Sequence, residues 1–362
     1  MEVNKGLVTD NLQSELLYHG GNITQEAKRL GVSATKLLDA SASLVPFQQP
    51  KEIHDCIIKT IKGIELRSYP DTNHSTLKES IAQWHNIDPS MVLPGNGAAE
   101  LITWAARDAS SLACSSLPSP GFADYKRALR CWKSTYQEIP LPLSWNAKFP
   151  QAFPIESNSN VLWVTNPHNP TGQLWSRNSL ERLLEKHRLV ICDEAFLPLV
   201  PSGEQQSLIP LVANYENLIV IRSLTKLFAI AGLRLGYVIS NPTRLDQWQK
   251  WRDPWPLNGI AIAIGSMLMN NQTIIENQMA KIETWITEEG HWLHTNLQLL
   301  HGITAHPSST NFQLIQSQKS LIDLREALAQ KGILVRDCRS FKGLGDTWLR
   351  ISLQTKSGNQ RI

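Results

Sequence analysis

The chain has 362 residues, of which 42% are apolar and 19% charged, and its net charge of +3 comes from 35 basic and 32 acidic residues. This length allows two domains with a large buried core, and charges spread without long like-charge blocks exclude a nucleic-acid-binding or membrane-binding footprint. Five scattered cysteines without C-x-x-C spacing predict reduced core residues, and exclude a disulfide framework and a zinc site.

The N-terminus lacks an apolar core of signal-peptide length, and no run approaches the roughly 18 apolar residues of a membrane span. We therefore expect a cytoplasmic protein.

Residues 1–45 form a polar lead-in that contains His19-Gly20-Gly21-Asn22 and a short helical pattern ending at Gly31. Half of a DNA-binding helix-turn-helix is one interpretation of this pattern, but the pattern changes at residues 39–42, before a recognition helix would fit. We expect instead a short helix that covers the edge of a larger domain and lies near the active site.

The pattern of helices and strands over residues 46–255 predicts a large α/β domain, which would bind a cofactor. Apolar residues at helical spacing predict an amphipathic helix over 51–64, and after a proline loop at 67–71 a second helix carries Leu77, Ile81 and Trp84 on one face. Helices then alternate with apolar runs at 111–115, 161–164, 189–192, 218–221 and 235–239. This rhythm predicts a mostly parallel sheet with helices on both faces.

The sequence pattern over residues 256–362 predicts a smaller α+β domain. Long helical patterns occupy 258–300, and a further helix over 320–331 is stopped by Gly332. Two strand-like segments follow, at 333–336 and 348–353.

Three loops carry candidate chemistry. The glycine turn at 95–97 opens a helix whose N-terminus would suit a phosphate, although a plain turn accounts for it equally well. The loop 166–172 follows a strand and holds two asparagines, each directly before a proline, which suits an amide contact to a polar ring substituent. Asp193 directly follows an apolar strand, so its carboxylate needs a cationic partner or a shared proton, and a pyridinium N–H would supply both.

A lysine stands between hydroxyl side chains and an apolar run in the stretch 223–237, with Arg234 farther along. An exposed lysine is a poor nucleophile, but one packed near apolar groups and other cations is partly neutral and can form a Schiff base. A surface lysine at the end of a loop is the alternative.

This combination resembles the fold-type I pyridoxal-phosphate enzymes of the aminotransferase class I/II group, over nearly the whole chain. The resemblance implies pyridoxal 5′-phosphate held covalently by Lys226, with Asp193 at the pyridine nitrogen, Asn169 at the ring 3-oxygen and Phe122 stacked on the ring. It also implies a set of phosphate ligands: Asn96, Gly97, Ala98, Ser223, Thr225 and Arg234.

Tyr69 resembles the tyrosine that reaches the phosphate bound in the neighbouring subunit. The resemblance therefore implies a homodimer with shared active sites.

Arg350 lies on a strand whose alternate residues Leu349, Ile351 and Leu353 point to the apolar face, so its own side chain points away from that face. In the family this position clamps the α-carboxylate of the substrate. A solvent-exposed strand arginine is the alternative.

Two branches of the family remain open, the histidinol-phosphate aminotransferases and the L-threonine O-3-phosphate decarboxylases. The opening at 19–23, phenylalanine at position 196 in place of the usual tyrosine, and the segments 223–226 and 332–338 favour the decarboxylases. Arg336, with His19, Gly20 and Asn169, is then the candidate phosphate site for the substrate. A short C-terminus and alanine at position 40 depart from the family pattern.

The expected activity is decarboxylation of L-threonine O-3-phosphate to (R)-1-aminopropan-2-ol O-phosphate, a step of cobalamin synthesis. An aminotransferase that uses 2-oxoglutarate is the alternative, and a non-catalytic cofactor-binding regulator is a remote one. No metal is expected.

Overall fold

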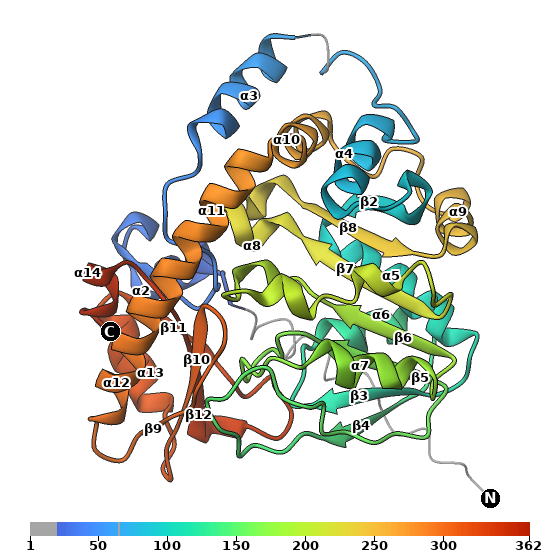
Figure 1. Ribbon diagram of the computed structural model, residues 1–362. Helices are drawn as coiled ribbons and strands as arrows, with labels where there is room; N and C mark the ends of the chain where they lie inside the picture. Colours follow the sequence, from blue (N-terminus) through green and yellow to red (C-terminus); the bar gives the residue numbers. More distant parts are fainter. Residues whose placement is uncertain (1–19, 64–65) are drawn as a thin grey trace, which may run out of the picture.

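A computed structural model describes residues 20–63 and 66–362 (Figure 1). Within them, the larger of two sheets has seven strands in the order β2-β8-β7-β6-β5-β3-β4. Its strands are β2 (Val92–Asn96), β3 (Ser115–Ser119), β4 (Tyr136–Pro140), β5 (Val161–Thr165), β6 (Leu189–Asp193), β7 (Leu218–Ser223) and β8 (Leu235–Ser240). The helices of this part are α3 (Lys51–Lys62), α4 (Ser75–His85), α5 (Gly97–Ser110), α6 (Asp124–Cys131), α7 (Arg177–Leu184), α8 (Leu224–Phe228), α9 (Pro242–Trp251) and α10 (Gly259–Met269).

The large sheet confirms the expected α/β class and is parallel except at β8. Strands β3, β4, β5, β6 and β7 pair in parallel, whereas β8 runs antiparallel to both β2 and β7. The chain between β7 and β8 holds only the short helix α8 and one 3₁₀ turn. A parallel return needs a longer crossover, so β8 comes back antiparallel.

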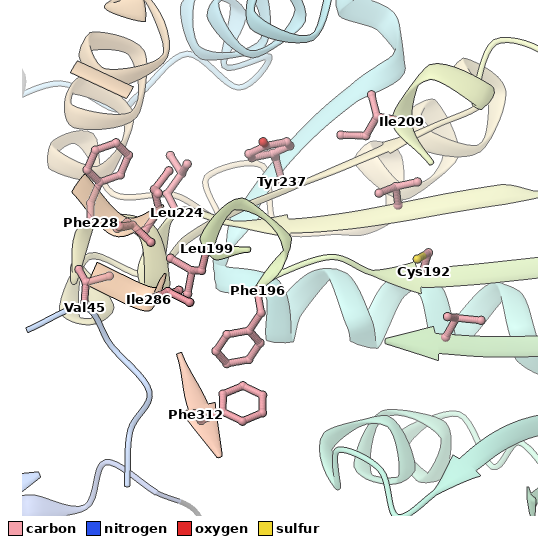
Figure 2. Close-up of a cluster of buried hydrophobic side chains, with 14 of the residues drawn as sticks. Val45, Cys192, Phe196, Leu199, Ile209, Leu224, Phe228, Tyr237, Ile286 and Phe312 are labelled. Carbon is pink, nitrogen blue, oxygen red and sulfur yellow. The ribbon is translucent and has the colours of Figure 1, made fainter. Parts of the chain in front are cut away.

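Both faces of this sheet are covered, which explains the continuous apolar runs. In β6, Val190 and Cys192 pack into one hydrophobic cluster and Leu189 and Ile191 into another. Figure 2 shows part of the first cluster, in which the Phe196 ring lies against Phe312 of the second sheet.

The smaller sheet has five strands in the order β1-β11-β12-β10-β9. Its strands are β1 (Leu38–Ala40), β9 (Thr304–Ala305), β10 (Phe312–Gln316), β11 (Ile333–Asp337) and β12 (Trp348–Ser352). The accompanying helices are α2 (Ile23–Leu30), α11 (Gln272–Trp285), a π-helical turn (Ile286–Gly290), α12 (His291–Gln298), α13 (Ile322–Gln330) and α14 (Lys356–Asn359).

The lead-in segment joins the smaller sheet, because β1 pairs in parallel with β11. A 3₁₀ turn (Ala34–Lys36) and β1 follow α2, so the described chain has no recognition helix at this place. The predicted domain boundary between residues 255 and 256 stays a prediction. Helix α10 follows this boundary in the chain but packs on α3 and α4, which precede it.

One strand prediction was wrong. Residues 111–114 form a turn after α5, and β3 begins only at Ser115. Ala113 has a φ of 79°, in the left-handed region that a strand residue does not adopt.

The described chain also contains short 3₁₀ turns at Pro89–Met91, Leu197–Leu199, Gly203–Gln206, Ile209–Leu211, Ala231–Leu233 and Gly345–Thr347. Within residues 20–63 and 66–362, no helix has both the length and the apolar character needed to span a membrane.

Candidate active site

A cavity of about 270 Å³ lies where the carboxyl ends of β5, β6 and β7 face the smaller sheet. The carboxyl edge of a parallel sheet is the usual place for a ligand in open α/β folds. The following predicted site residues line this cavity together: Gly20, Ala98, Phe122, Asn169, Asp193, Ser223, Thr225, Lys226, Arg234, Arg336 and Arg350.

Lys226 lies in α8, directly after β7. The Ser223 hydroxyl caps this helix by accepting a hydrogen bond from the Thr225 amide at 3.3 Å. The Lys226 ammonium donates to the Ala42 carbonyl at 3.2 Å, and its Nζ lies 5.4 Å from the centre of the Phe196 ring. Burial, and then the charges of Arg350 and Arg234, lower the pKa of Lys226 to about 8. Its amine is therefore more often neutral than that of a surface lysine.

The lowered pKa of Lys226 predicts a pH-dependent stability of the cofactor-free protein. Because the pKa falls from 10.5 to about 8 on folding, the unfolded chain binds more protons at this residue between these pH values. Stability should therefore rise with pH across this window, and Lys226→Met should remove this contribution. Urea unfolding at several pH values measures the free energy of unfolding of both proteins. Lys226→Met should be more stable than the wild type at pH 8, and this difference should shrink towards pH 10. A difference that stays constant with pH would contradict the prediction.

Asp193 closes β6 and is only 6% exposed. Its Oδ2 accepts a hydrogen bond from the Tyr125 hydroxyl at 2.7 Å, and its Oδ1 accepts one from the Ala195 amide at 3.0 Å. Burial raises the pKa of Asp193. No described lysine, arginine or histidine forms an ion pair with it, so the carboxylate still needs a charged or proton-sharing partner. A pyridine nitrogen in the cavity fits this need.

The opposite end of the cavity is built for an anion. Gly97 has a φ of 74°, which strains any larger residue, and a Cβ atom there would lie 2.6 Å from Nη2 of Arg234 and displace that guanidinium group. The amide of Ala98 belongs to the N-terminus of α5, a helix of 14 residues. Arg234 forms no ion pair with a described residue, and a phosphate would find a guanidinium and a helix N-terminus together here.

Asn169 contacts the arginine that was predicted to clamp the substrate. Its Oδ1 accepts a hydrogen bond from Nη1 of Arg350 at 2.6 Å, while Nη2 of Arg350 donates to the Ser41 carbonyl at 3.1 Å. The Asn169 amide NH₂ has no acceptor among the described residues. It is therefore free to donate to a ring oxygen.

Arg350 and Arg336 lie directly opposite each other on β12 and β11. They are 6% and 5% exposed, and neither forms an ion pair with a described carboxylate. Burial, and then the charge of Arg336, lower the pKa of Arg350 to about 9, and burial lowers the pKa of Arg336 to about 10. Two buried guanidinium groups without counterions predict an anionic ligand.

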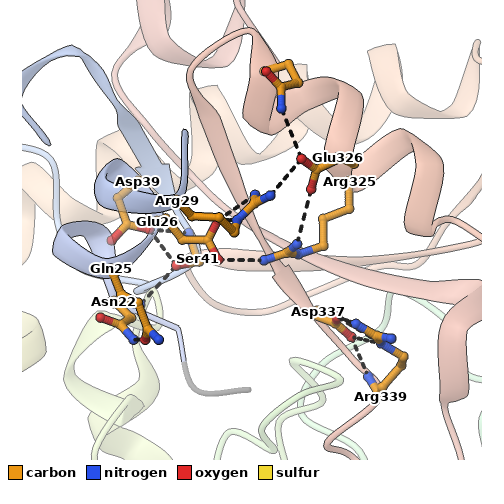
Figure 3. Close-up of polar contacts among 12 residues, drawn as sticks. Asn22, Gln25, Glu26, Arg29, Asp39, Ser41, Arg325, Glu326, Asp337 and Arg339 are labelled. Atoms are coloured by element: carbon orange, nitrogen blue, oxygen red, sulfur yellow. Dashed lines mark hydrogen bonds and ion pairs between the residues drawn. The ribbon is translucent and has the colours of Figure 1, made fainter. Parts of the chain in front are cut away.

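The described part of the lead-in forms one wall of the site. Gly20 approaches Ser41 so closely that a Cβ atom would lie 2.2 Å from the Ser41 carbonyl oxygen. A second cavity of about 300 Å³ shares Gly20, Ser41 and Arg336 with the first. Figure 3 shows how ion pairs between α2 and α13 hold this wall, with Arg29 bonded to Glu326 at 2.7 Å and Arg325 to Glu26 at 3.2 Å.

Three predicted residues with a described position do not line the cavity in this chain. Asn96 and Gly97 lie beside it, where the Asn96 amide donates to Glu100 at 2.6 Å. His19 lies outside the described residues. Tyr69 is 80% exposed, stacks on Trp255 at 4.5 Å and lines a separate surface pocket, so its role across a dimer stays a prediction.

Other cavity-facing residues were missed by the sequence analysis. Ser41 and Ala42 come from the lead-in, and Thr165 ends β5 next to Asp193 in the register. Tyr125, which hydrogen-bonds to Asp193, lies in the first turn of α6, whereas Phe122 precedes this helix. The contact joins residues 68 positions apart, and no local spacing in the sequence indicates it.

Comparison with known proteins gives a consistent result. Residues 35–362 match the family model described as aminotransferase class I and II. The threonine-phosphate decarboxylase of Salmonella typhimurium is 30% identical over 356 residues, covering 95% of this chain and 94% of that protein. The histidinol-phosphate aminotransferase of Caldanaerobacter subterraneus is 31% identical over 331 residues, covering 89% and 90%.

A solved structure shares the fold. The crystal structure of L-threonine-O-3-phosphate decarboxylase from Porphyromonas gingivalis superposes with a TM-score of 0.76 at 24% identity, covering 88% of this chain and 95% of that one.

Proposed function

Because the chain belongs to the aminotransferase class I and II family, we propose that it decarboxylates L-threonine O-3-phosphate to (R)-1-aminopropan-2-ol O-phosphate, a step of cobalamin synthesis. It is an enzyme, and its cofactor is pyridoxal 5′-phosphate. The observation that carries the proposal is the pair Arg350 and Arg336, two buried guanidinium groups that line the cavity with Lys226 and form no ion pair with a described carboxylate. A substrate with both a carboxylate and a phosphate supplies one anion for each.

The residues of the site divide into a cofactor end and a substrate end. Lys226 would hold the cofactor, with Asp193 at its ring nitrogen and Arg234 at its phosphate. Pyridoxal phosphate, once bound, supplies a conjugated electron sink for the bond that breaks at the α-carbon of the substrate. The cofactor end serves any reaction of the family, so the substrate end must decide which bond that is.

The substrate end orients the leaving carboxylate. Arg350 is fixed by Asn169 and by the Ser41 carbonyl, so a carboxylate bound to it has a defined direction. In the proposed reaction the carboxylate leaves as carbon dioxide, and a proton takes its place on the α-carbon. The amine of Lys226, with a pKa of about 8, can carry that proton.

An aminotransferase acting on histidinol phosphate is the second candidate, supported by relatives of that name at similar identity. The residue at position 196 favours the first candidate. Phenylalanine has no phenol hydroxyl to offer to the cofactor, and the Phe196 ring instead packs edge-on against Phe312 at 5.2 Å.

A product assay tests the proposal. The purified holoenzyme is incubated with L-threonine O-3-phosphate or with histidinol phosphate, each with and without 2-oxoglutarate, and the products are identified by mass spectrometry. We expect carbon dioxide and the amino-alcohol phosphate from the first substrate without a keto acid. Strict dependence on 2-oxoglutarate would favour the aminotransferase.

Arg350→Ala should raise KM for a carboxylate substrate by an amount equivalent to roughly 2–4 kcal/mol, because one partner of a buried charge pair is lost. Steady-state kinetics with the substrate found above measure this change. Arg244→Ala is a suitable control, since Arg244 pairs with Asp108 away from the cavity. A wild-type KM for Arg350→Ala would show that Arg350 does not bind the substrate.

The homodimer belongs to the same proposal. Tyr69 is exposed in the single chain and would reach the partner's site. Mixing inactive Tyr69→Phe and Lys226→Ala proteins under subunit exchange should restore part of the activity, because one mixed site carries both native residues. The expected cytoplasmic location is likewise a proposal.

A further inference from the structure

Tyr125 joins two strand ends beneath the cavity. Thr165 and Asp193 are direct neighbours in the parallel register of β5 and β6, and the Tyr125 hydroxyl from α6 reaches both. It lies 2.8 Å from Thr165 Oγ1 and 2.7 Å from Asp193 Oδ2. A phenol can donate only one hydrogen bond, and the Asp193 carboxylate accepts it. The Thr165 hydroxyl therefore donates its own hydrogen bond to the Tyr125 oxygen. The three groups form one directed chain of hydrogen bonds that ends on Asp193.

The side chain of Tyr125 is held firmly in this position. It is 3% exposed, and its ring packs at 5.1 Å from Trp163 and edge-on at 5.6 Å from Phe122. Because aromatic neighbours confine the ring from two sides, the hydroxyl has little freedom to leave the carboxylate. Burial, and then the nearby Asp193 charge, raise the pKa of Tyr125 well above its ordinary value. The phenol therefore stays protonated and remains a donor.

The electrostatic balance at Asp193 makes this donor important. Burial raises the pKa of Asp193, and Asp124 from α6 raises it further. Lys226 from α8 lowers it, as do the hydrogen bonds from Tyr125 and the Ala195 amide. Without the phenol, the ionised form of this buried carboxylate would lose one of its two hydrogen-bond donors.

We propose that Tyr125 is a positioning residue that keeps Asp193 ionised and oriented, so that the proton the two partners share stays on the cofactor's ring nitrogen. A carboxylate stabilised by a donor is a weaker base, which leaves the proton on the nitrogen it faces. Thr165 strengthens the effect from the far end of the chain. The inference rests on the cofactor and not on the choice between decarboxylation and transamination.

The experiment measures the protonation state of the cofactor's ring nitrogen directly. Holoenzyme is prepared with pyridoxal phosphate labelled with ¹⁵N in its ring, and the ¹⁵N chemical shift reports protonation of that nitrogen. Tyr125→Phe should move the signal towards the deprotonated position and weaken cofactor binding by about 10- to 100-fold, as expected for a lost hydrogen bond to a charged group. Tyr215→Phe is the matched control, because Tyr215 bonds to Glu181 outside the cavity.

Thr165 provides a second, milder pair of variants. Thr165→Val should move the ¹⁵N signal in the same direction by a smaller amount, and Thr165→Ser should restore it because the hydroxyl returns. If Tyr125→Phe does not fold, the Thr165 variants still test the proposed hydrogen-bond chain to Asp193. A wild-type ¹⁵N shift in a folded Tyr125→Phe holoenzyme, or equal shifts for Thr165→Val and Thr165→Ser, would overturn the proposal. The ¹⁵N shift and the cofactor affinity are measured without substrate. The proposed role of Tyr125 and the proposed decarboxylase activity can therefore fail independently of each other.

Discussion

Lys226→Ala is expected to abolish the visible absorption band of the bound cofactor and to lower turnover by several orders of magnitude. The amine of Lys226 lines the cavity, and its lowered pKa of about 8 makes it available for a covalent bond. Arginine side chains nearby cannot replace that amine, because Arg336 and Arg350, with pKa values of about 10 and about 9, stay mostly protonated at neutral pH. Absorption spectra of the purified protein with added cofactor measure the first effect.

Lys78→Ala is the control for this change. Lys78 is also half-buried and donates to Gln249 at 3.0 Å, but it lies on α4 outside the cavity. Its variant should keep the visible band. An unchanged band in Lys226→Ala would refute the assignment of Lys226.

Asp193→Asn should lower kcat by about 10²- to 10³-fold, the usual loss when a main electrostatic element of a site is removed. The asparagine keeps the size of the side chain but carries no charge, so it cannot hold a proton on the ring nitrogen. Steady-state kinetics at saturating cofactor measure the effect, and saturation separates it from weaker cofactor binding.

A stability measurement distinguishes this loss from misfolding. Burial raises the pKa of Asp193 in the cofactor-free protein, so the charge opposes folding there. The cofactor-free Asp193→Asn protein should therefore be at least as resistant to urea as the wild type. Asp124→Asn, which changes a neighbouring carboxylate bonded to Arg127, should retain most of the activity. Near-normal kcat in Asp193→Asn would argue against the proposed role.

The meeting of Asn169, Asp193 and Lys226 at one cavity was predictable because these residues follow consecutive strands, and their roles toward the cofactor stay predictions. Asn169 follows β5, Asp193 ends β6 and Lys226 follows β7, and parallel strands bring their carboxyl ends to one edge. Apolar runs marked these strands clearly. The false strand at 111–115 shows the limit of that signal, since a short run of small residues does not reveal the left-handed turn at Ala113.

The substrate end depended on contacts between distant segments. The alternation of β12 predicted the side to which Arg350 points, but only the register with β11 placed Arg336 opposite it. Likewise, the helix pattern of the lead-in did not reveal that β1 would pair with β11 and bring Ser41 to Arg350. Strand register is set by packing across the whole sheet, which local sequence patterns do not contain.

The sequence by itself determined the fold class and the family, and it placed Asn169, Asp193 and Lys226 just at or after strand ends, because strand periodicity and residues at strand ends are local properties. Tertiary structure alone decided three things: the two opposed arginines, the wall formed by residues 20–42, and the chain from Thr165 through Tyr125 to Asp193. Each joins residues from separate elements at hydrogen-bond distance. Such contacts depend on packing and register, and therefore appear only when the whole chain has folded.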